Sequence, residues 1–167
     1  MRHLLDEPVS KVEGELMELL RLPLVAALDK ARSVLIAGAG GGYDVFCGLP
    51  LYFALRAAGK KVHLANLTFS ALDWSGSRRL AESLVVVDAS STPIGSYAPE
   101  LHLSRWFRSQ RTEEVPVHCF GRTGVIPLRA AYALLVDRLE LDAVVLVDGC
   151  TESHMRGDEP GHGTPQE

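Results

Sequence analysis

The chain has 167 residues, 47% of them hydrophobic, and its 17 basic and 21 acidic residues leave a net charge of −4. These values fit a single globular domain. They also argue against a nucleic-acid partner, because no run of basic residues could follow a phosphate backbone. An acidic start and the lack of an apolar run of ~20 residues speak against a signal peptide and a membrane span, so we expect a cytoplasmic protein with no membrane partner.

Two helices are predicted before the first strand. Ser10 and Glu13 form a capping box ahead of one amphipathic segment, and Pro23 can open a second helix. The single domain then has three parts. They are a helical lead-in (1–31), a region in which strands and helices alternate (32–148), and an acidic loop or tail rich in glycine and proline (149–167).

The stretch from Ser33 to Asp44 is the most informative part of the chain. A short apolar run without helical period ends in four glycines within five positions, which is typical of a buried parallel strand followed by a phosphate-binding loop. Glycines lack the Cβ atoms that keep a ligand from the backbone, so the loop is a candidate anion site. The alternative is that the glycines only form a tight turn. Ordinary NAD binding and methyl transfer are less favoured, because Tyr43 replaces a third glycine and Asn66 stands where a carboxylate would hold a ribose.

Four further apolar runs alternate with helical patterns. In the helix after the glycine loop we prefer a kink at Pro50 over a new helix that begins at Leu49, and we expect Gly59 to end this helix in the left-handed region. The alternation predicts an α/β fold, a Rossmann-like doubly wound and mostly parallel five-stranded sheet. The predicted strands are Val34–Ala37, Val62–Leu67, Leu84–Val87, Val115–Phe120 and Ala143–Val147.

Parallel strands end at the same edge of a sheet, so the residues that follow the five strands should meet there. On this basis Asp88 to Ser91, after the third strand, are expected at the same edge as the glycine loop. The residues that we expect to bind a cofactor or an anionic ligand are Gly38, Gly40, Gly41, Gly42, Asn66, Arg122 and Thr123.

Carboxylates gather after the fifth strand. Asp148, Glu152 and Asp158 lie among glycines and hydroxyl side chains, a composition suited to a hard cation, for which Mg²⁺ is the candidate. The alternative is a solvated tail. The candidate catalytic residues are Asp44, Asp148 and Glu152, as proton-transferring or metal-binding groups.

Four stretches share a pattern with one known family. They are Gly38-Ala-Gly-Gly-Gly-Tyr-Asp-Val, Tyr97-Ala-Pro-Glu-Leu, Thr123-Gly-Val with Pro127-Leu, and Val147-Asp-Gly-Cys-Thr-Glu-Ser-His-Met-Arg-Gly-Asp-Glu. On these motifs the chain from about Arg32 onward resembles the amino-terminal half of DUF1152, a bacterial and archaeal family of unknown function. In the last motif Cys150, Glu152 and His154 replace the family's glycine, aspartate and leucine. The resemblance implies a Rossmann-like fold with a site at these motifs, and it brings no established reaction.

The sequence therefore favours a small-molecule enzyme, or the ligand-binding half of one, for a phosphorylated, nucleotide-like or carboxylated metabolite. The Asp-Gly-x-x-Glu element is also similar to D-glutamate cyclases, so a metal-assisted lyase or a hydrolase is the reaction class considered. The alternative is a non-catalytic nucleotide sensor or interaction module, since no nucleophile is paired with a base. We also expect the chain to be incomplete as a functional unit and to self-associate or bind a missing carboxyl-terminal half, because only a polar tail follows the fifth strand.

Overall fold

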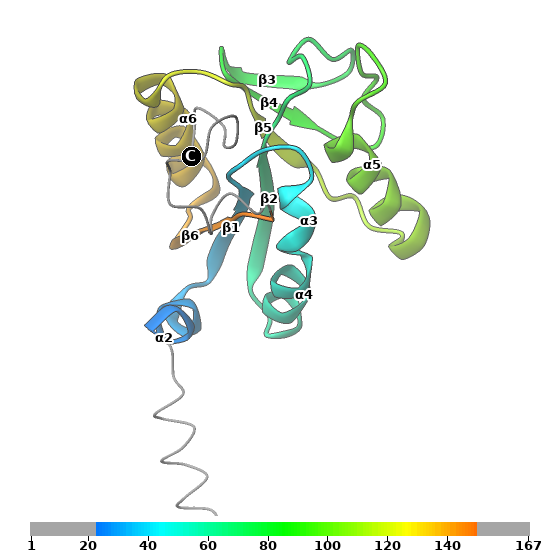
Figure 1. The fold of residues 1–167 in the computed structure, drawn as a ribbon. Helices are drawn as coiled ribbons and strands as arrows, with labels where there is room; N and C mark the ends of the chain where they lie inside the picture. Colours follow the sequence, from blue (N-terminus) through cyan, green and yellow to red (C-terminus); the bar gives the residue numbers. More distant parts are fainter. Residues whose placement is uncertain (1–22, 150–167) are drawn as a thin grey trace, which may run out of the picture. The chain divides into compact units, whose positions relative to one another are not determined.

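The computed structural model describes residues 23–149 (Figure 1). The predicted first helix and the tail residues Glu152 and Asp158 lie outside these described residues. The chain divides into two compact units after Ala31, and each unit is considered by itself. Helix α2 (Pro23–Lys30) belongs to the first unit and begins at Pro23, as predicted. Among the described residues, no helix is long and apolar enough to cross a membrane.

The second unit contains one mixed sheet. Its strands are β1 (Ser33–Gly38), β2 (Lys61–Leu67), β3 (Arg78–Ala81), β4 (Leu84–Val87), β5 (Val117–Phe120) and β6 (Ala143–Val147). They lie in the order β3-β4-β5-β2-β1-β6. Strands β5, β2, β1 and β6 are parallel, whereas β4 runs antiparallel to both β3 and β5. The chain is therefore an α/β protein with a mostly parallel sheet, as predicted.

The predicted number of strands and the direction of one of them are wrong. The polar stretch after β2 contributes β3, so six strands of the sheet lie within the described residues. A two-residue connection, Glu82 and Ser83, then turns the chain back as the antiparallel β4. Val87 pairs with Val117 at the start of β5, so the Asp88–Ser91 turn lies where the parallel strands begin. The expectation that these residues share the carboxyl ends of the strands with the glycine loop is therefore wrong. Four buried apolar residues look the same in either direction, so their pattern held no information about direction.

Helices lie on both sides of this sheet (Figure 1). They are α3 (Asp44–Cys47), α4 (Leu49–Ala57), α5 (Pro99–Trp106), which continues as the π-helix η1 (Phe107–Arg111), and α6 (Val125–Leu139). The kink that we preferred at Pro50 is replaced by a break at Gly48, and α4 begins at Leu49 with Pro50 in its first turn, where its missing N–H costs no hydrogen bond. Gly59 has a φ of +78°, as expected for the end of this helix.

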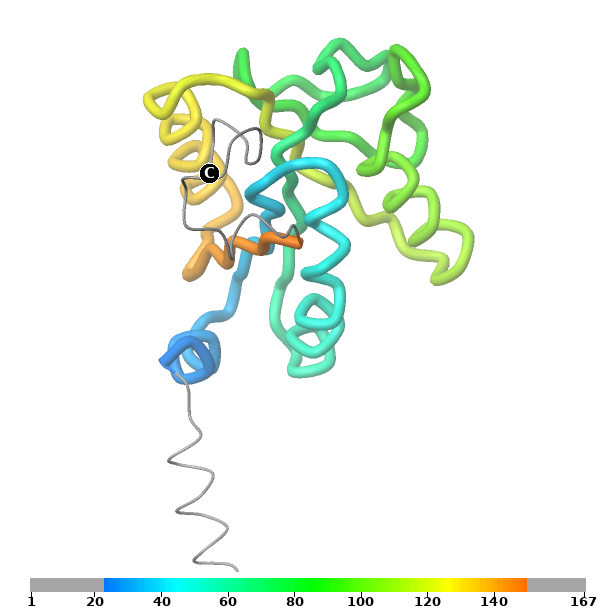
Figure 2. Tube along the Cα trace, viewed as in Figure 1, coloured from blue at the N-terminus to red at the C-terminus, as the bar shows by residue number. Residues whose placement is uncertain are grey.

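Helix α6 covers one face of the sheet. Its buried Ala131 and Leu135 join a core cluster of alternate strand residues, and Tyr132 stacks on Phe120 with ring centroids 4.2 Å apart. The strand members of this cluster are Leu35, Ala37, Ala65, Leu67, Leu84 and Phe120. The residues between them point to the opposite face. On that face, Figure 2 follows the chain from β1 (blue) through the glycine loop into α3 and α4 (cyan).

Two histidines lie side by side on the strands β2 and β5. The ring centroids of His63 and His118 are 6.3 Å apart, and His118 donates its Nδ1–H to the Leu64 carbonyl at 3.1 Å. Burial lowers the pKa of His63 to about 4, and His118 and Lys61 add to this shift. Burial also lowers the pKa of His118. Both rings are therefore neutral at pH 7.

We expect the fold to lose stability as the pH falls from about 6.5 to about 4. In this interval the unfolded chain binds a proton that the folded His63 does not, so its contribution to the free energy of unfolding drops by less than ~1.4 kcal/mol per pH unit for this half-buried side chain. The lowered pKa of His118 acts in the same direction. His63→Leu should flatten this slope in urea unfolding, whereas the exposed control His102→Gln should keep it. Equal slopes in the wild type and His63→Leu would contradict the assignment.

Strand β6 forms one edge of the sheet. Val144 and Leu146 pair with Leu35 and Ala37 and so point to the α6 side, where they are 39% and 60% exposed. An edge strand with exposed apolar side chains can pair with another chain.

This edge leads us to expect self-association at micromolar concentrations. Leu146→Lys should shift sedimentation equilibrium towards the monomer, because a charge on an edge strand opposes pairing. The matched control is Leu24→Lys in α2, where Leu24 is 51% exposed. A wild type that stays monomeric throughout the concentration series would refute the expectation.

Candidate functional site

The glycine loop joins β1 to α3. Gly41 and Gly42 have φ values of +95° and +61°, which residues with a Cβ atom rarely adopt. A Cβ atom on Gly41 would also lie only 2.6 Å from the Phe69 ring. At its start the loop is tied to β6, because the Ala39 N–H donates to the Val147 carbonyl at 2.9 Å. Phe69 on one side and β6 on the other therefore restrict the position of the loop.

Asn66, near the end of β2, holds the same loop from within the protein. Its Nδ2 donates to the Gly42 carbonyl at 2.9 Å and to Glu100 Oε1 at 2.7 Å. Gly38 leaves room for this side chain, since a Cβ atom there would lie 2.1 Å from Asn66 Oδ1. One amide group therefore joins the glycine loop, β2 and the first turn of α5.

The polar groups behind the loop are buried. Glu100 and Asn66 have no exposed surface, and Asp44 is 3% exposed. Burial raises the pKa of Glu100, and its hydrogen bonds with Asn66 and Thr68 offset this only in part. Within residues 23–149, Glu100 Oε2 and Asn66 Oδ1 accept no hydrogen bond of ordinary geometry. A buried polar atom left without a partner costs about 1–3 kcal/mol, and carboxyl groups whose pKa is shifted by burial cluster at functional sites.

Asp44 lies beside the end of β6. Its Oδ1 accepts a hydrogen bond from the Gly149 N–H at 3.2 Å, so Asp148 follows a neighbouring strand at the same edge. Carboxylate oxygens suit Mg²⁺. In the described part of the chain, however, no group of three or more Asp, Glu, His or Cys residues could hold a metal ion. The other predicted metal ligands, Glu152 and Asp158, lie outside it.

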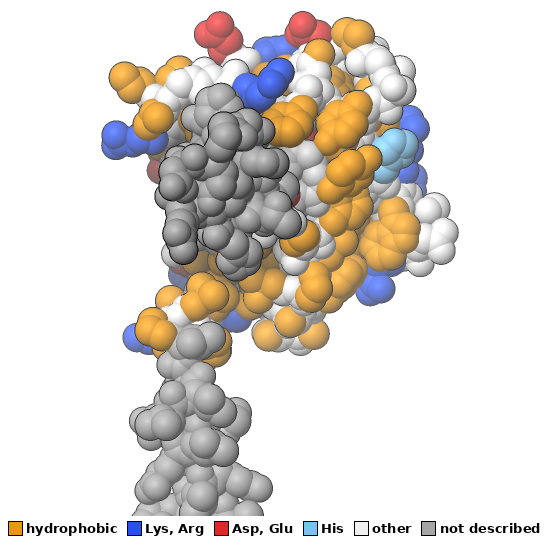
Figure 3. Space-filling model, viewed as in Figure 1, with side chains coloured by type: hydrophobic (Ala, Val, Ile, Leu, Met, Phe, Trp, Pro, Cys, Tyr) orange, Lys and Arg blue, Asp and Glu red, His pale blue; other side chains and the backbone are white. Residues whose placement is uncertain are grey.

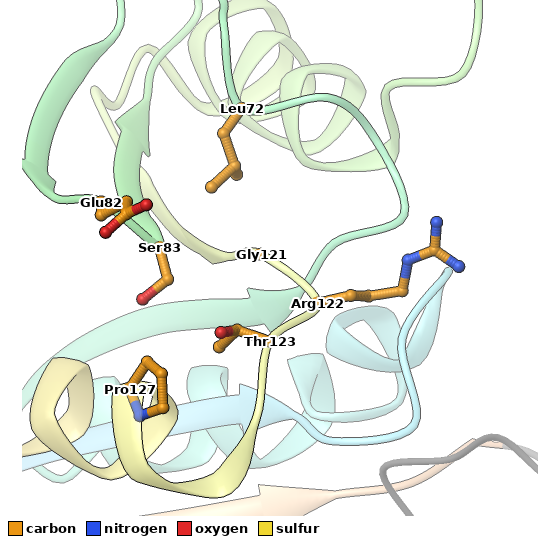
Figure 4. Close-up of a pocket in the computed structure, with 7 residues that line it drawn as sticks. All are labelled: Leu72, Glu82, Ser83, Gly121, Arg122, Thr123 and Pro127. Carbon is orange, nitrogen blue, oxygen red and sulfur yellow. The ribbon is translucent and has the colours of Figure 1, made fainter.

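Arg122 and Thr123 follow β5 and point in different directions. The Arg122 guanidinium lies over the Phe69 ring, 5.4 Å from its centroid, and makes no ion pair with another residue of the range 23–149. Figure 4 shows the Arg122 side chain directed away from the hollow that Thr123 faces. That hollow has a volume of about 330 Å³ and is lined by Leu72, Glu82, Ser83, Gly121, Arg122, Thr123 and Pro127. Through Phe69 and Gly41, the guanidinium is instead linked to the glycine loop.

Two tyrosines border the loop. A Cβ atom on Gly42 would lie 3.2 Å from the Tyr97 hydroxyl, and the Tyr97 ring meets Tyr43 edge to face with centroids 5.9 Å apart. Burial raises the pKa of Tyr97, and Glu100, Tyr43 and Asp44 raise it further. Tyr97 is therefore a neutral phenol at pH 7.

The structure brings only some of the predicted ligand-binding residues together. Of the predicted ligand-binding residues, Thr123 lies in a separate hollow. Gly40, Gly41 and Gly42 share one loop after Gly38 at the end of β1. Asn66 and Phe69 contact this loop, and Arg122 lies on Phe69. Glu100 is absent from the residues predicted from the sequence, because its place in the first turn of a helix carries no sign that the side chain is buried. The motif Tyr97-Ala-Pro-Glu-Leu was the available signal, and no role was assigned to its members.

Loss of the Asn66 amide should loosen the glycine loop. Asn66→Ala leaves the Gly42 carbonyl and the Glu100 carboxyl without their donor, so we expect a loss of about 1–3 kcal/mol in the free energy of unfolding. Amide hydrogen exchange in the loop should rise more than exchange in α6. Uniform acceleration across the unit would contradict a local role.

Glu100→Gln tests the same contact by titration. The folded protein keeps the Glu100 proton above the ordinary pKa of 4.5, so the contribution of this carboxyl to the free energy of unfolding should fall as the pH rises from 4.5 to the raised pKa, opposite in sign to the contribution of His63. Glu100→Gln keeps an acceptor for Asn66 and should lack this loss. Glu82→Gln, at the β3–β4 turn, serves as the control.

Comparisons with known proteins give no further guide to this site. No protein-family model matches the chain. No curated protein is significantly similar to it. No solved structure matches it significantly.

Proposed function

We propose that the chain is a small-molecule enzyme that binds an anionic metabolite, phosphorylated or carboxylated, at the glycine loop. The observation that carries this proposal is the convergence of Asp44, Asn66 and Glu100 behind the loop, all three buried. Burial of carboxyl groups is costly, and ionisable groups with shifted pKa values gather at functional sites. Ligands of α/β folds also bind at the carboxyl ends of parallel strands.

In this proposal Arg122 supplies the positive charge. Phe69 orients its guanidinium, whose donors form no ion pair with other described residues and remain available for bidentate binding of a phosphate or carboxylate. The dipole of α3 is not the source of attraction, because this helix has four residues and begins with a carboxylate. The raised pKa of Glu100 favours its neutral form and reduces repulsion of an anion.

Asp44 is the proposed proton-transferring residue, with Asp148 as its neighbour at the end of β6. A magnesium ion on these oxygen atoms, with Glu152 as a further ligand, would suit a lyase or hydrolase that removes a proton or activates water. The buried Glu100 acts on Asn66 and so positions the loop.

We also propose the finer fold assignment, a Rossmann-like doubly wound domain, and membership of DUF1152. Two contacts support the family proposal. Asn66 links the Gly38–Val45 motif to Glu100, and Gly42 lies against Tyr97, so two motifs that are distant in sequence contribute to one site.

A non-catalytic ligand sensor is the second candidate. The full burial of Asn66 and Glu100 favours it, since such groups can serve to hold a loop without touching a substrate. Conversion of a bound compound, lost in Asp44→Asn while binding remains, would support the enzyme. Binding without any turnover would support the sensor.

Arg122→Gln tests the anion site directly. In a thermal-shift panel of phosphorylated and carboxylated metabolites, we expect ligand-dependent stabilisation of the wild type and a ten- to hundredfold weaker affinity in the variant, about 1.5–3 kcal/mol for a hydrogen-bonded charge. Arg129→Gln, an exposed arginine on α6, is the matched control and should bind like the wild type. An equal response in all three proteins would disprove the site.

A further inference from the structure

The ring pair at the rim of the glycine loop is exposed. Tyr43 is 58% and Tyr97 is 38% exposed, and Phe69 beside them is 38% exposed. Figure 3 shows hydrophobic side chains gathered over α3 and α4 and the loops next to them. Aromatic side chains bury large areas when they can, so exposed rings around a candidate site indicate a surface for a ligand.

Ring contacts restrain both tyrosine side chains, and a hydrogen bond holds the Tyr97 backbone. The Tyr97 carbonyl accepts the Ser70 Oγ–H at 2.7 Å, and Tyr43 also packs on Phe46 with ring centroids 5.6 Å apart. The Tyr43 and Tyr97 rings cross at 86°, an arrangement in which the edge of one meets the face of the other. A ring held in this way loses little freedom when a second ring stacks on it.

Phe69 differs from the two tyrosines, because its ring contacts a cation. One contact of its ring is with Gly41, and the Arg122 guanidinium lies over the ring. Phe69 is therefore a support for the guanidinium. Gly41 and Tyr43 are two residues apart in the chain, so their Cα atoms lie at most ~7 Å from each other. The residue between them, Gly42, lies against the Tyr97 hydroxyl, so the rings and the cation border the same short loop.

We propose that the ligand of this site is a planar aromatic or heteroaromatic compound that carries an anionic group, such as a nucleoside monophosphate, with its ring stacked on Tyr43 next to Tyr97 and its anion on Arg122. This inference rests on the proposed function and narrows its substrate class. It requires no carboxylate for a ribose, which agrees with the amide of Asn66 at the end of β2 being used for the loop.

Isothermal titration of matched compounds tests the inference. Adenosine, guanosine and uridine monophosphates are compared with ribose 5-phosphate and inorganic phosphate, which share the anion and lack the ring. Stacking on an aromatic side chain is worth about 5- to 150-fold in affinity. At least one nucleotide should bind more tightly than ribose 5-phosphate by a factor in this range.

Tyr43→Leu should remove this advantage, whereas Tyr43→Phe keeps the ring and should retain it. Intrinsic melting temperatures of both variants control for folding. If ribose 5-phosphate binds in an Arg122-dependent manner as tightly as every nucleotide, or if Tyr43→Leu changes nothing, the ring inference is wrong and the anion site stands. If none of these compounds binds the wild type, the ring inference is wrong, and the wider panel with Arg122→Gln decides the anion site separately.

Discussion

The two hydrogen bonds of the Asn66 amide are the contact on which the site depends. One Nδ2 group donates to Gly42 in the loop after β1 and to Glu100 at the start of α5, while its own residue is part of β2. Three segments far apart in the chain are thereby fixed to one another inside the protein, where each lost hydrogen bond leaves a buried polar atom. Gly38 belongs to the same arrangement, because any side chain there would displace the amide.

Electrostatics sets the character of this edge of the sheet. Asp44 and Glu100 bring two carboxyl groups close to a loop that we propose for an anion, which is tolerable only if charge is reduced or compensated. The raised pKa of Glu100 reduces it, and Arg122 above Phe69 provides compensation. Elsewhere in the described chain the arginines Arg56, Arg79, Arg108 and Arg111 pair with carboxylates, which fits a surface role.

Local patterns predicted much of the fold. The apolar runs Leu84–Val87 and Ala143–Val147 coincide with β4 and β6, and Pro23 and Gly59 mark helix ends as expected. The apolar pattern could not predict strand direction, because the hairpin with β3 sets it. In β3 the two arginines are exposed and the two apolar residues are partly buried, so Arg78–Ala81 did not stand out as a strand. A strand at the margin of a sheet needs no continuous apolar run.

The candidate site was predictable to the extent that glycines and strand ends report on local geometry. Asn66 and Arg122 were identified from their positions alone, but their partners were not. A buried Glu100 and a ring under Arg122 result from long-range packing, which no periodicity encodes. Asn66 was considered as a ligand-binding group, whereas its amide is engaged with Gly42 and Glu100.

The antiparallel course of β4 has a consequence for how the site is assembled. After β4 the chain lies where the parallel strands begin. It must return along the length of the strands before Tyr97 and Glu100 reach the glycine loop at the carboxyl ends. Hydrogen bonds fix the returning segment at two points. Near its beginning Thr92 and Ser75 exchange backbone hydrogen bonds, and near its end the Ser70 hydroxyl donates to the Tyr97 carbonyl. The number of residues between these two points therefore sets where α5 begins. An insertion or deletion in this segment would alter the position of α5, although none of the altered residues lies at the site.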